Sequence, residues 1–422
     1  MRKFPIKIKL LKSFSTTYIV NVLTIVFTSL TFSAMGNTAA FDDLLPNVDK
    51  VDFTYQGAFR FSTEIIGHSR MSYATGPFTI SSGGDSLFAV GHVHDQALAE
   101  FLIPTLSKTK NPKELAFATP IQKFRHILKY ESRIKNPQKN DRITGMEVIE
   151  GELFVNAVEY YDAPGDNTDT TFIVREANNL DSSKVDGFFK LRGRAHAAGW
   201  ISKLPAKWKT EFSASYLMGY ANNYAINSRL SMGPSAFVTY LDNYAGIDES
   251  GGMIGNKTLL DYSLKHPLRE DLYNTTLKND VWTDESSAVY GFILPNTDYY
   301  LVLGYSGGHK SGMGYKIKQS NGNVCGGPCA KDAGDYYNHY WIYDVNDLVK
   351  VQQNKLKPWQ PEPIMYGELN LPFQPKNGFK RMIGADFDEK NGKLYMLLEH
   401  IDHSQSQFEA APVMIVYDLL KG

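Results

Sequence analysis

The sequence predicts an all-β fold and, within that class, a β-propeller. Two observations lead to this prediction. Aromatic residues are abundant, with 25 Tyr and 24 Phe among 422 residues, while helix-favouring runs of Ala, Leu, Glu and Lys are scarce, and aromatic and β-branched residues favour strands. A loose repeat of strand, polar loop and strand also runs along the chain, at intervals of tens of residues, which is typical of propeller blades.

The repeat is recognisable in four places. Each copy has an apolar run rich in β-branched and aromatic residues, a polar loop and a second apolar run. The copies span residues 86–104, 152–180, 300–348 (with a long insertion) and 393–420. A shorter strand containing a glycine precedes several copies, at residues 142–149, 229–238, 287–294 and 381–388.

The number of blades follows from the length of the repeat. About 380 mature residues at roughly 40–50 residues a blade give seven or eight blades, and we expect seven. The strand at residues 51–61 is expected to complete the last blade and close the ring, which removes a free sheet edge. A pair of β-sandwiches is the alternative architecture.

The N-terminus resembles a signal peptide, predicted over residues 1–40, with a single propeller catalytic domain over 41–422. A basic start is followed by an apolar stretch at residues 18–32 and by small residues at 34–40. The apolar stretch is shorter than the ~20 residues that a membrane span needs, so a retained anchor is the less favoured alternative. We therefore expect a secreted or periplasmic protein with no membrane attachment after cleavage.

The overall charge limits the class of partner. The formal net charge is −1, which argues against a nucleic-acid binder because phosphate neutralisation needs a surplus of Lys and Arg. An acidic polysaccharide remains compatible, since a local basic cleft can exist within a neutral total. No pattern indicates an oligomer, and we expect a monomer.

Propeller geometry predicts where function lies. The loop before the first strand of a blade and the loop after its second strand open on the same face, and loops on a rigid scaffold usually carry the chemistry. We expect the following residues on that face: His68, His92, His94, Arg142, Tyr160, Tyr161, Arg229, His309, Arg381, His400 and His403. We assign no role to His400 and His403.

One long loop contains a cluster of metal-ligand residues. His309, Cys325, Cys329 and His339 fall within 31 residues, and Gly-Gly-Pro separates the two cysteines. Thiolate and imidazole are the ligands that zinc prefers, and four of them make a closed, structural site. We therefore predict structural zinc. A local disulfide between the two cysteines is the alternative, which export would permit.

The residue types on the predicted face suit β-elimination from a uronate. An Arg pairs with the sugar carboxylate, a Tyr or His removes the neighbouring proton, and a His or Tyr donates a proton to the leaving oxygen. A glycosidase would instead need a pair of carboxylates, for which no pair stands out. The candidates are Asp162, Asp166, Asp386 and Glu399.

Several segments resemble the propeller-type ulvan lyases of marine bacteria. The similarity rests on residues 55–61, 86–104, the loop at 160–162, and the segment from His309 through both cysteines to Trp341. It extends over most of the mature chain, and the loop with the two cysteines is its most specific part. The resemblance implies a seven-bladed propeller, a structural zinc, and eliminative cleavage of sulfated rhamnose–uronate chains.

The resemblance also implies a site of two His, a Tyr and an Arg. These correspond best to His68, His92, Tyr160 and Arg175 as catalytic residues. The alternatives, which we expect to bind substrate, are His94, Tyr161, Arg142 and Arg229. Each of these residues also has a plain structural interpretation, as an exposed loop residue, a strand-end histidine or a blade-packing side chain.

Two other function classes compete with the lyase. A non-catalytic propeller that binds a glycan or a protein needs the same aromatic and basic face but no acid–base pair. A glycoside hydrolase on a propeller needs two carboxylates across the channel.

Overall fold

The computed structural model describes residues 39–40, 51–129, 134–222, 229–245, 252–376 and 378–421. Their regular structure is almost entirely β, with two α-helices, α1 (Ala206–Phe212) and α2 (Val345–Gln352), and three short 3-10 helices, η2 (Pro112–Glu114), η3 (Arg194–Ala197) and η4 (Asp242–Tyr244). The predicted signal peptide lies outside the described residues, apart from its last two. No helix in these ranges is long and apolar enough to cross a membrane.

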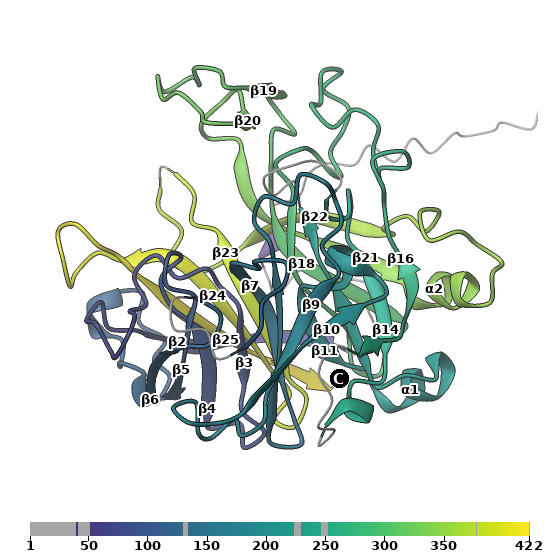
Figure 1. Ribbon diagram of the computed structural model, residues 1–422. Helices are drawn as coiled ribbons and strands as arrows, with labels where there is room; N and C mark the ends of the chain where they lie inside the picture. The colour runs from purple at the N-terminus through teal and green to yellow at the C-terminus, as the bar shows by residue number, and fades with distance from the viewer. Residues whose placement is uncertain are drawn as a thin grey trace, which may run out of the picture. The chain divides into compact units, whose positions relative to one another are not determined.

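The strands form five sheets, antiparallel except for the short edge strands β1 and β15, and these sheets are the blades of a propeller (Figure 1). Blade 1 contains β3 (Phe78–Ile80), β4 (Ser86–Val90), β5 (Ala97–Leu102) and β6 (Thr119–His126). Blade 2 contains β7 (Arg142–Ile149), β8 (Glu152–Val158), β9 (Asp169–Val174) and β10 (Val185–Leu191), extended by β15 (Met253–Ile254). Blade 3 contains β11 (Trp200–Lys203), β12 (Tyr216–Gly219), β14 (Ala236–Thr239) and β16 (Asn256–Leu260).

Blade 4 contains β17 (Ser287–Ile293), β18 (Tyr299–Gly307), β21 (Tyr336–Asp344) and β22 (Met365–Asn370), with β13 (Ala221–Asn222) and β1 (Ala39–Ala40) at its edges. Blade 5 contains β23 (Met382–Asp388), β24 (Lys393–Asp402), β25 (Ala411–Lys421) and β2 (Val51–Arg60). A separate hairpin of β19 (Met313–Tyr315) and β20 (Pro328–Ala330) projects from blade 4.

The first strands of the blades form a closed inner ring. Each of β3, β7, β11, β17 and β23 contacts the next, and β23 returns to β3. The glycines of these strands permit the close approach. A Cβ on Gly145 would lie 1.9 Å from the carbonyl oxygen of Gly199, and one on Gly384 would lie 2.1 Å from that of Gly76. Neither position can therefore carry a side chain.

The N-terminal strand closes the ring, as predicted. β2 pairs antiparallel with β25 from Val51 opposite Lys421 to Arg60 opposite Val413. The last blade is therefore made from both ends of the domain, and no sheet is left incomplete at the point where the ring meets itself. This arrangement joins segments more than 300 residues apart in sequence.

The prediction of seven blades is wrong, because the structure has five. The inner strands begin at Phe78, Arg142, Trp200, Ser287 and Met382, so successive blades start 58 to 95 residues apart. Long connections take up the extra residues, and strand content alone does not reveal them. One predicted first strand is also misplaced: Arg229 precedes β14, the third strand of blade 3, whose inner strand is β11.

The apolar core lies between neighbouring blades. Separate clusters of buried side chains fill the interfaces between blades 5 and 1, 1 and 2, and 2 and 3, while one larger cluster joins blades 3, 4 and 5. The larger cluster includes Trp282 and Trp341, whose rings lie 5.0 Å apart. Because each sheet is buried on both faces, its central strands are continuous apolar runs, and this is why the repeat is visible in the sequence.

Candidate functional site

A cavity of about 350 Å³ lies on the propeller axis, and all five inner strands contribute to its lining. It opens on the side where the inner strands begin and the second strands end, which we call the entry face. The polar and aromatic side chains at its mouth include Tyr73, Arg142, Tyr305, Arg381, Glu399 and His400. Of the residues predicted to gather on this face, Arg142, Arg381 and His400 line the cavity.

Arg142 begins β7 and lines this cavity. Its guanidinium donates to the carbonyl oxygen of Asp141 at 2.9 Å and lies 5.0 Å from the centre of the Tyr160 ring. Its Nε is buried without a hydrogen-bond partner. The nearest carboxylate contact is with Asp141, at 3.9 Å, which is beyond hydrogen-bonding distance.

Other arginines of comparable burial are paired more closely. Arg60 lies 3.0 Å from Asp402, and Arg175 lies 2.6 Å from Asp186 and 3.0 Å from Glu152. A buried charge normally has such a partner, because moving an unpaired charge from water into the protein interior costs free energy. Arg142, whose side chain is only 15% exposed, departs from this pattern. It is therefore suited to an anionic group that enters the cavity.

Tyr73 separates two histidines beside the same mouth. The Tyr73 ring lies 5.6 Å from the ring of His92 and 5.2 Å from that of His400, edge to face in both cases. The Tyr73 hydroxyl donates to the carbonyl oxygen of Phe408 at 3.0 Å. Three potential proton-transfer groups are thus brought together from blades 1 and 5.

Burial lowers the pKa of both His92 and His400 below the ordinary value for histidine. Both imidazoles are therefore neutral at neutral pH. The backbone N–H of His94 donates to Nδ1 of His92 at 3.1 Å, so the proton of neutral His92 resides on Nε2. His92 then presents a donor rather than a base toward its surroundings.

The backbone around the mouth is strained. Tyr73, Gln96 and His400 have positive φ values of 58°, 51° and 49°, a region that residues other than glycine rarely adopt. Gln96 is buried and holds the inner strand of blade 2 by accepting from the N–H of Ile143 at 2.7 Å. Strain of this kind persists where the surrounding contacts enforce it, and it tends to gather at functional sites.

The loop after β8 carries the predicted tyrosines. Tyr160 covers the Arg142 guanidinium, and Tyr161 is 61% exposed on the same face. Arg229 reaches across from blade 3 and donates to the carbonyl oxygen of Ala163. Arg229 therefore braces this loop, whereas Tyr160 and Tyr161 are both exposed on its surface.

Two residues implied by the resemblance lie away from the cavity. Arg175 follows β9 at the opposite end of blade 2 from Tyr160, where Glu152 and Asp186 engage its guanidinium. His68 lies at the edge of blade 1, with its ring 4.9 Å from that of His126. The geometry favours Arg142 over Arg175 as the anion-binding arginine, because only Arg142 lines the cavity.

The predicted zinc ligands do not converge. Cys325 and Cys329 form a disulfide, which is the alternative that the sequence left open. His309 has both ring nitrogens engaged, Nε2 with the Ser306 hydroxyl at 2.7 Å and Nδ1 with the Asn279 carbonyl oxygen at 2.8 Å. His339 is buried in β21.

No group of three or more metal-ligating side chains occurs in the part of the chain that the structure describes. As arranged, the four residues do not fit a zinc site, because disulfide sulfur is not a thiolate ligand. Structural zinc stays a prediction, and it would require Cys325 and Cys329 to be reduced thiols.

The predicted carboxylates do not form a pair in the axial cavity. Asp162 is buried and accepts from the N–H groups of its own loop, and Asp166 is exposed. Glu399 lines the cavity, but both of its oxygens pair with Arg381, at 2.6 and 3.1 Å. Asp386 lies at the other end of the axis.

That other end holds a second cavity of about 240 Å³. Burial raises the pKa of Glu147 to about 8 and that of Asp386 to about 6. Glu147 lies 3.1 Å from the Lys203 amino group, and Asp386 accepts from the Tyr290 hydroxyl at 3.0 Å and from the N–H of Ile80 at 2.7 Å. These contacts involve the inner strands of all five blades at the axis, which is a structural role.

Tyr73, His400 and Arg381 were missed or left without a role by sequence reasoning. Arg381 was expected at the rim of the central opening and His400 on the same face, but neither was given a role in the chemistry. Tyr73 lies in the connection between blades 5 and 1, outside every repeat. Only the positive φ values mark Tyr73 and His400, and these are not visible in the sequence.

No protein-family model matches the sequence, and no curated protein gives a significant match. Among solved structures, the chain is similar to the RRP9 WD40 repeats, with 9% identity, a TM-score of 0.30, and coverage of 82% of this chain and 67% of that one. It is similar to the alpha-L-arabinofuranosidase PaAbf62A from Podospora anserina in complex with cellotriose, with 10% identity, a TM-score of 0.34, and coverage of 86% and 97%.

It is also similar to an exo-1,5-alpha-L-arabinanase from a bovine ruminal metagenomic library, with 8% identity, a TM-score of 0.37, and coverage of 85% and 99%. The assignment of a propeller rests on the five sheets and the closed inner ring of this chain, and the chemistry rests on its own side chains.

Proposed function

We propose that this protein is a polysaccharide lyase that cleaves an acidic, uronate-containing glycan by β-elimination in the axial cavity. The observation that carries the proposal is Arg142, a largely buried guanidinium that lines the cavity without a carboxylate at hydrogen-bonding distance. A sugar carboxylate is the anion that such a site fits, and a guanidinium binds carboxylates bidentately.

Each chemical step has a residue in reach of the mouth. Arg142 neutralises the uronate carboxylate, which eases loss of the proton at C5. His400 is neutral because burial lowers its pKa, and it takes that proton. Tyr73 donates its hydroxyl proton to the leaving glycosidic oxygen at C4, in place of its present bond to Phe408.

The C5–H and C4–O bonds break, and a C4–C5 double bond forms. His92 packs against Tyr73 and holds its ring in position.

The choice of elimination over hydrolysis rests on the acidic residues. A glycosidase of the usual kind needs two carboxyl groups about 5–9.5 Å apart across the scissile bond. Of the described acidic residues, Glu399 alone lines the cavity, and Arg381 occupies both of its oxygens. We therefore favour the lyase over the hydrolase.

The substrate class follows from the resemblance as well as from the site. The similarity of several segments to ulvan lyases, together with a cationic and aromatic mouth, supports a sulfated rhamnose–uronate chain as the substrate. Export of the protein, as the N-terminal sequence predicts, would place it where such polymers occur. A binding propeller without turnover uses the same face and is separated from the lyase by the experiment below.

The first experiment mixes the purified protein with ulvan and follows absorbance in the near ultraviolet, where unsaturated uronates absorb. Alginate, pectin and a heparan-type chain run in parallel. We expect a rise with ulvan. No rise with any of the four, from folded protein, rejects elimination of these glycans and favours the binding propeller.

The second experiment tests the assigned residues. Tyr73→Phe and His400→Gln are each expected to lower kcat by about 10²–10⁴-fold, the usual contribution of general acid–base catalysis. Tyr240→Phe and His403→Gln, exposed residues that do not line the cavity, serve as matched controls. Equal rates in test and control variants would contradict the assignment.

A further inference from the structure

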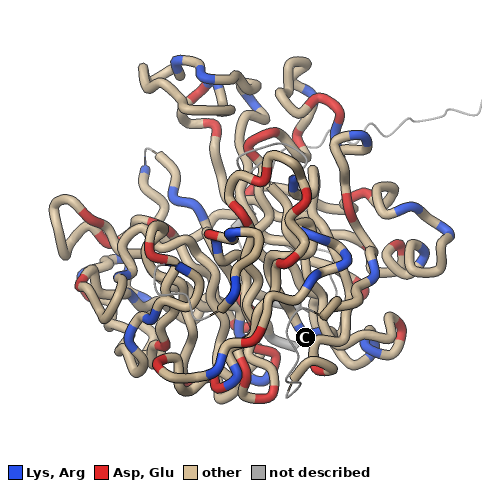
Figure 2. The backbone as a smooth tube through the Cα atoms, in the orientation of Figure 1, with Lys and Arg blue, Asp and Glu red and all other residues tan. Residues whose placement is uncertain are grey.

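A basic segment projects from the entry face beside the proposed site. Residues 308–331 contain four lysines and no Asp or Glu, in a chain whose formal net charge is −1. The segment follows β18, contains the hairpin β19–β20, and returns to blade 4 at β21. The hairpin stands clear of the five sheets in Figure 1, and Figure 2 shows its lysines in blue.

The segment is held in shape by contacts within it and by a hydrogen bond to β21. A disulfide joins Cys325 to Cys329 of β20, and the N–H of Cys325 donates to the Ile317 carbonyl oxygen at 3.0 Å. Gln319 donates to the Ala330 carbonyl oxygen at 2.8 Å and to the Tyr336 hydroxyl at 2.9 Å. A rigid arm loses little conformational freedom when it binds a ligand.

Three of the four lysines are unengaged by carboxylates. Lys310 pairs with Glu368 at 2.7 Å. Lys316, Lys318 and Lys331 are exposed, and no ion pair joins them to an acidic residue within the described ranges. Their amino groups therefore face solvent as point charges.

An aromatic ring accompanies these charges. Tyr315 is 58% exposed, and the Lys316 amino group lies 5.2 Å from its ring centre. The nearest acidic residue in sequence is Asp332, which accepts from the Ser320 hydroxyl and from the N–H of Gly334. An exposed ring beside free ammonium groups suits a charged sugar, with its flat face on the ring and its anionic groups on the lysines.

We propose that this hairpin is a polyanion-binding arm, which holds a part of an acidic polysaccharide outside the axial cavity through Lys316, Lys318 and Lys331, with Tyr315 as a stacking surface. The arm and the cavity mouth open on the same face, so one chain can occupy both. The proposal rests on the proposed function for the kind of polymer, but binding at the arm does not require turnover.

The test compares two full-length variants of equal charge. One carries Lys316→Ala, Lys318→Ala and Lys331→Ala. The control carries Lys108→Ala, Lys355→Ala and Lys357→Ala, exposed lysines of other segments. Affinity electrophoresis measures binding to ulvan, polygalacturonate, dextran sulfate and neutral dextran, so that carboxylate and sulfate recognition are separated.

We expect the arm variant to bind the anionic polymers about 10- to 100-fold more weakly than the wild type, on the scale known for lysines at anionic surfaces. Its salt dependence should fall by about 2 in the slope of log K against log salt, at ~0.7 per charge. The control should bind the anionic polymers as the wild type does. The wild type and both variants should not bind neutral dextran. If the arm variant and the control variant bind the anionic polymers with equal affinity, the proposal of a polyanion-binding arm is rejected.

Failure of the arm is distinguishable from failure of the proposed function. If the wild type binds ulvan through the arm but generates no unsaturated product, the lyase activity is rejected and the polyanion-binding arm is supported. If the wild type cleaves ulvan and the arm variant binds the polymer with the affinity and KM of the wild type, the polyanion-binding arm is rejected and the lyase activity is supported. With both correct, the arm variant has a raised KM on polymer and an unchanged kcat.

Discussion

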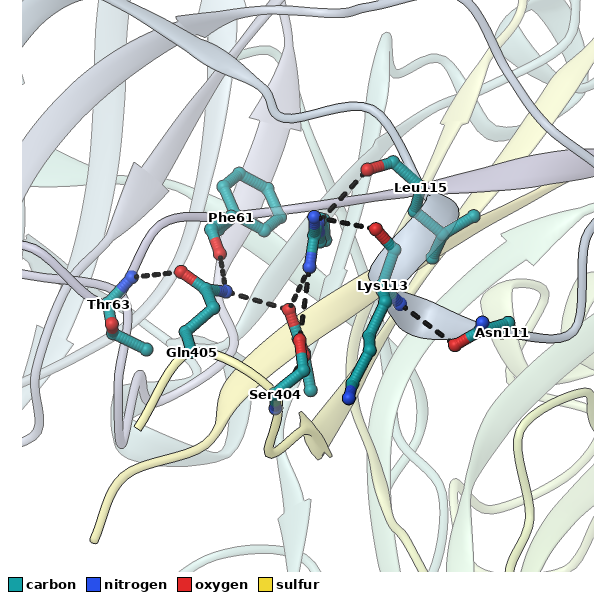
Figure 3. A network of polar contacts seen from close by, with 9 residues as sticks. Phe61, Thr63, Asn111, Lys113, Leu115, Ser404 and Gln405 are labelled. Carbon is teal, nitrogen blue, oxygen red and sulfur yellow. Dashed lines mark hydrogen bonds and ion pairs between the residues drawn. The ribbon is translucent and has the colours of Figure 1, made fainter. Parts of the chain in front are cut away.

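A buried ion pair joins the end of β2 to β24 within the blade that closes the ring, and loss of this pair should destabilise the propeller. Arg60 lies 3.0 Å from Asp402, whose side chain has no exposed surface, and donates to the carbonyl oxygens of Lys113 and Leu115 at 2.9 and 3.0 Å. Gln405 joins the same network (Figure 3), donating to Asp402 at 2.7 Å.

The magnitude follows from what Arg60→Ala would leave behind. Asp402 would remain a fully buried carboxylate without its cation, and breaking one partner of a buried pair costs about 3–5 kcal/mol. Arg70→Ala is the matched control, because the Arg70–Glu409 pair, at 2.5 Å, is 32% and 21% exposed. A partly exposed pair is worth about 0–1 kcal/mol.

Denaturant unfolding of both variants at pH 7 measures the difference. Burial acts to raise the pKa of Asp402, but hydrogen bonds from Ser404, Gln405 and Arg60 outweigh it and hold that pKa below its ordinary value. The contribution of Asp402 is therefore present above the ordinary aspartate range and is lost as pH falls through the lowered pKa. A loss below about 1 kcal/mol for Arg60→Ala, equal to that of the control, would refute the reasoning.

The remaining predictions concern the site and the hairpin. Arg175→Ala should cost about 3–5 kcal/mol of stability with unchanged activity per folded molecule. Arg142→Lys should keep stability and lower kcat/KM by about 10²-fold or more. Denaturant unfolding and reaction rates, measured on the same samples of each variant, distinguish these two outcomes. Thiol titration of the unreduced protein should find neither Cys325 nor Cys329 free, and metal analysis should find no stoichiometric zinc. Because burial lowers the pKa of His400, the acid limb of kcat/KM should lie below pH 6.5, and a limb above that value would exclude His400 as the base.

The sequence by itself determined the strand-rich composition, the repeat and the closing strand. These are local properties: blades buried on both faces are continuous apolar runs, and β2 has the same pattern as the strands it joins. The placement of Arg142, Arg381 and His400 on one face also followed from the sequence, because propeller connectivity alone assigns loops to faces.

Only the tertiary structure decided the number of blades and the identity of the site. Connections of different length separate the inner strands, and loop length costs little free energy, so the spacing of repeats does not count blades. Arg142 and Arg175 look equivalent in sequence, but antiparallel pairing of β8 with β9 places them at opposite ends of blade 2. Tyr73 and His400 meet because the ring closes, and no local pattern records a contact between residues so far apart.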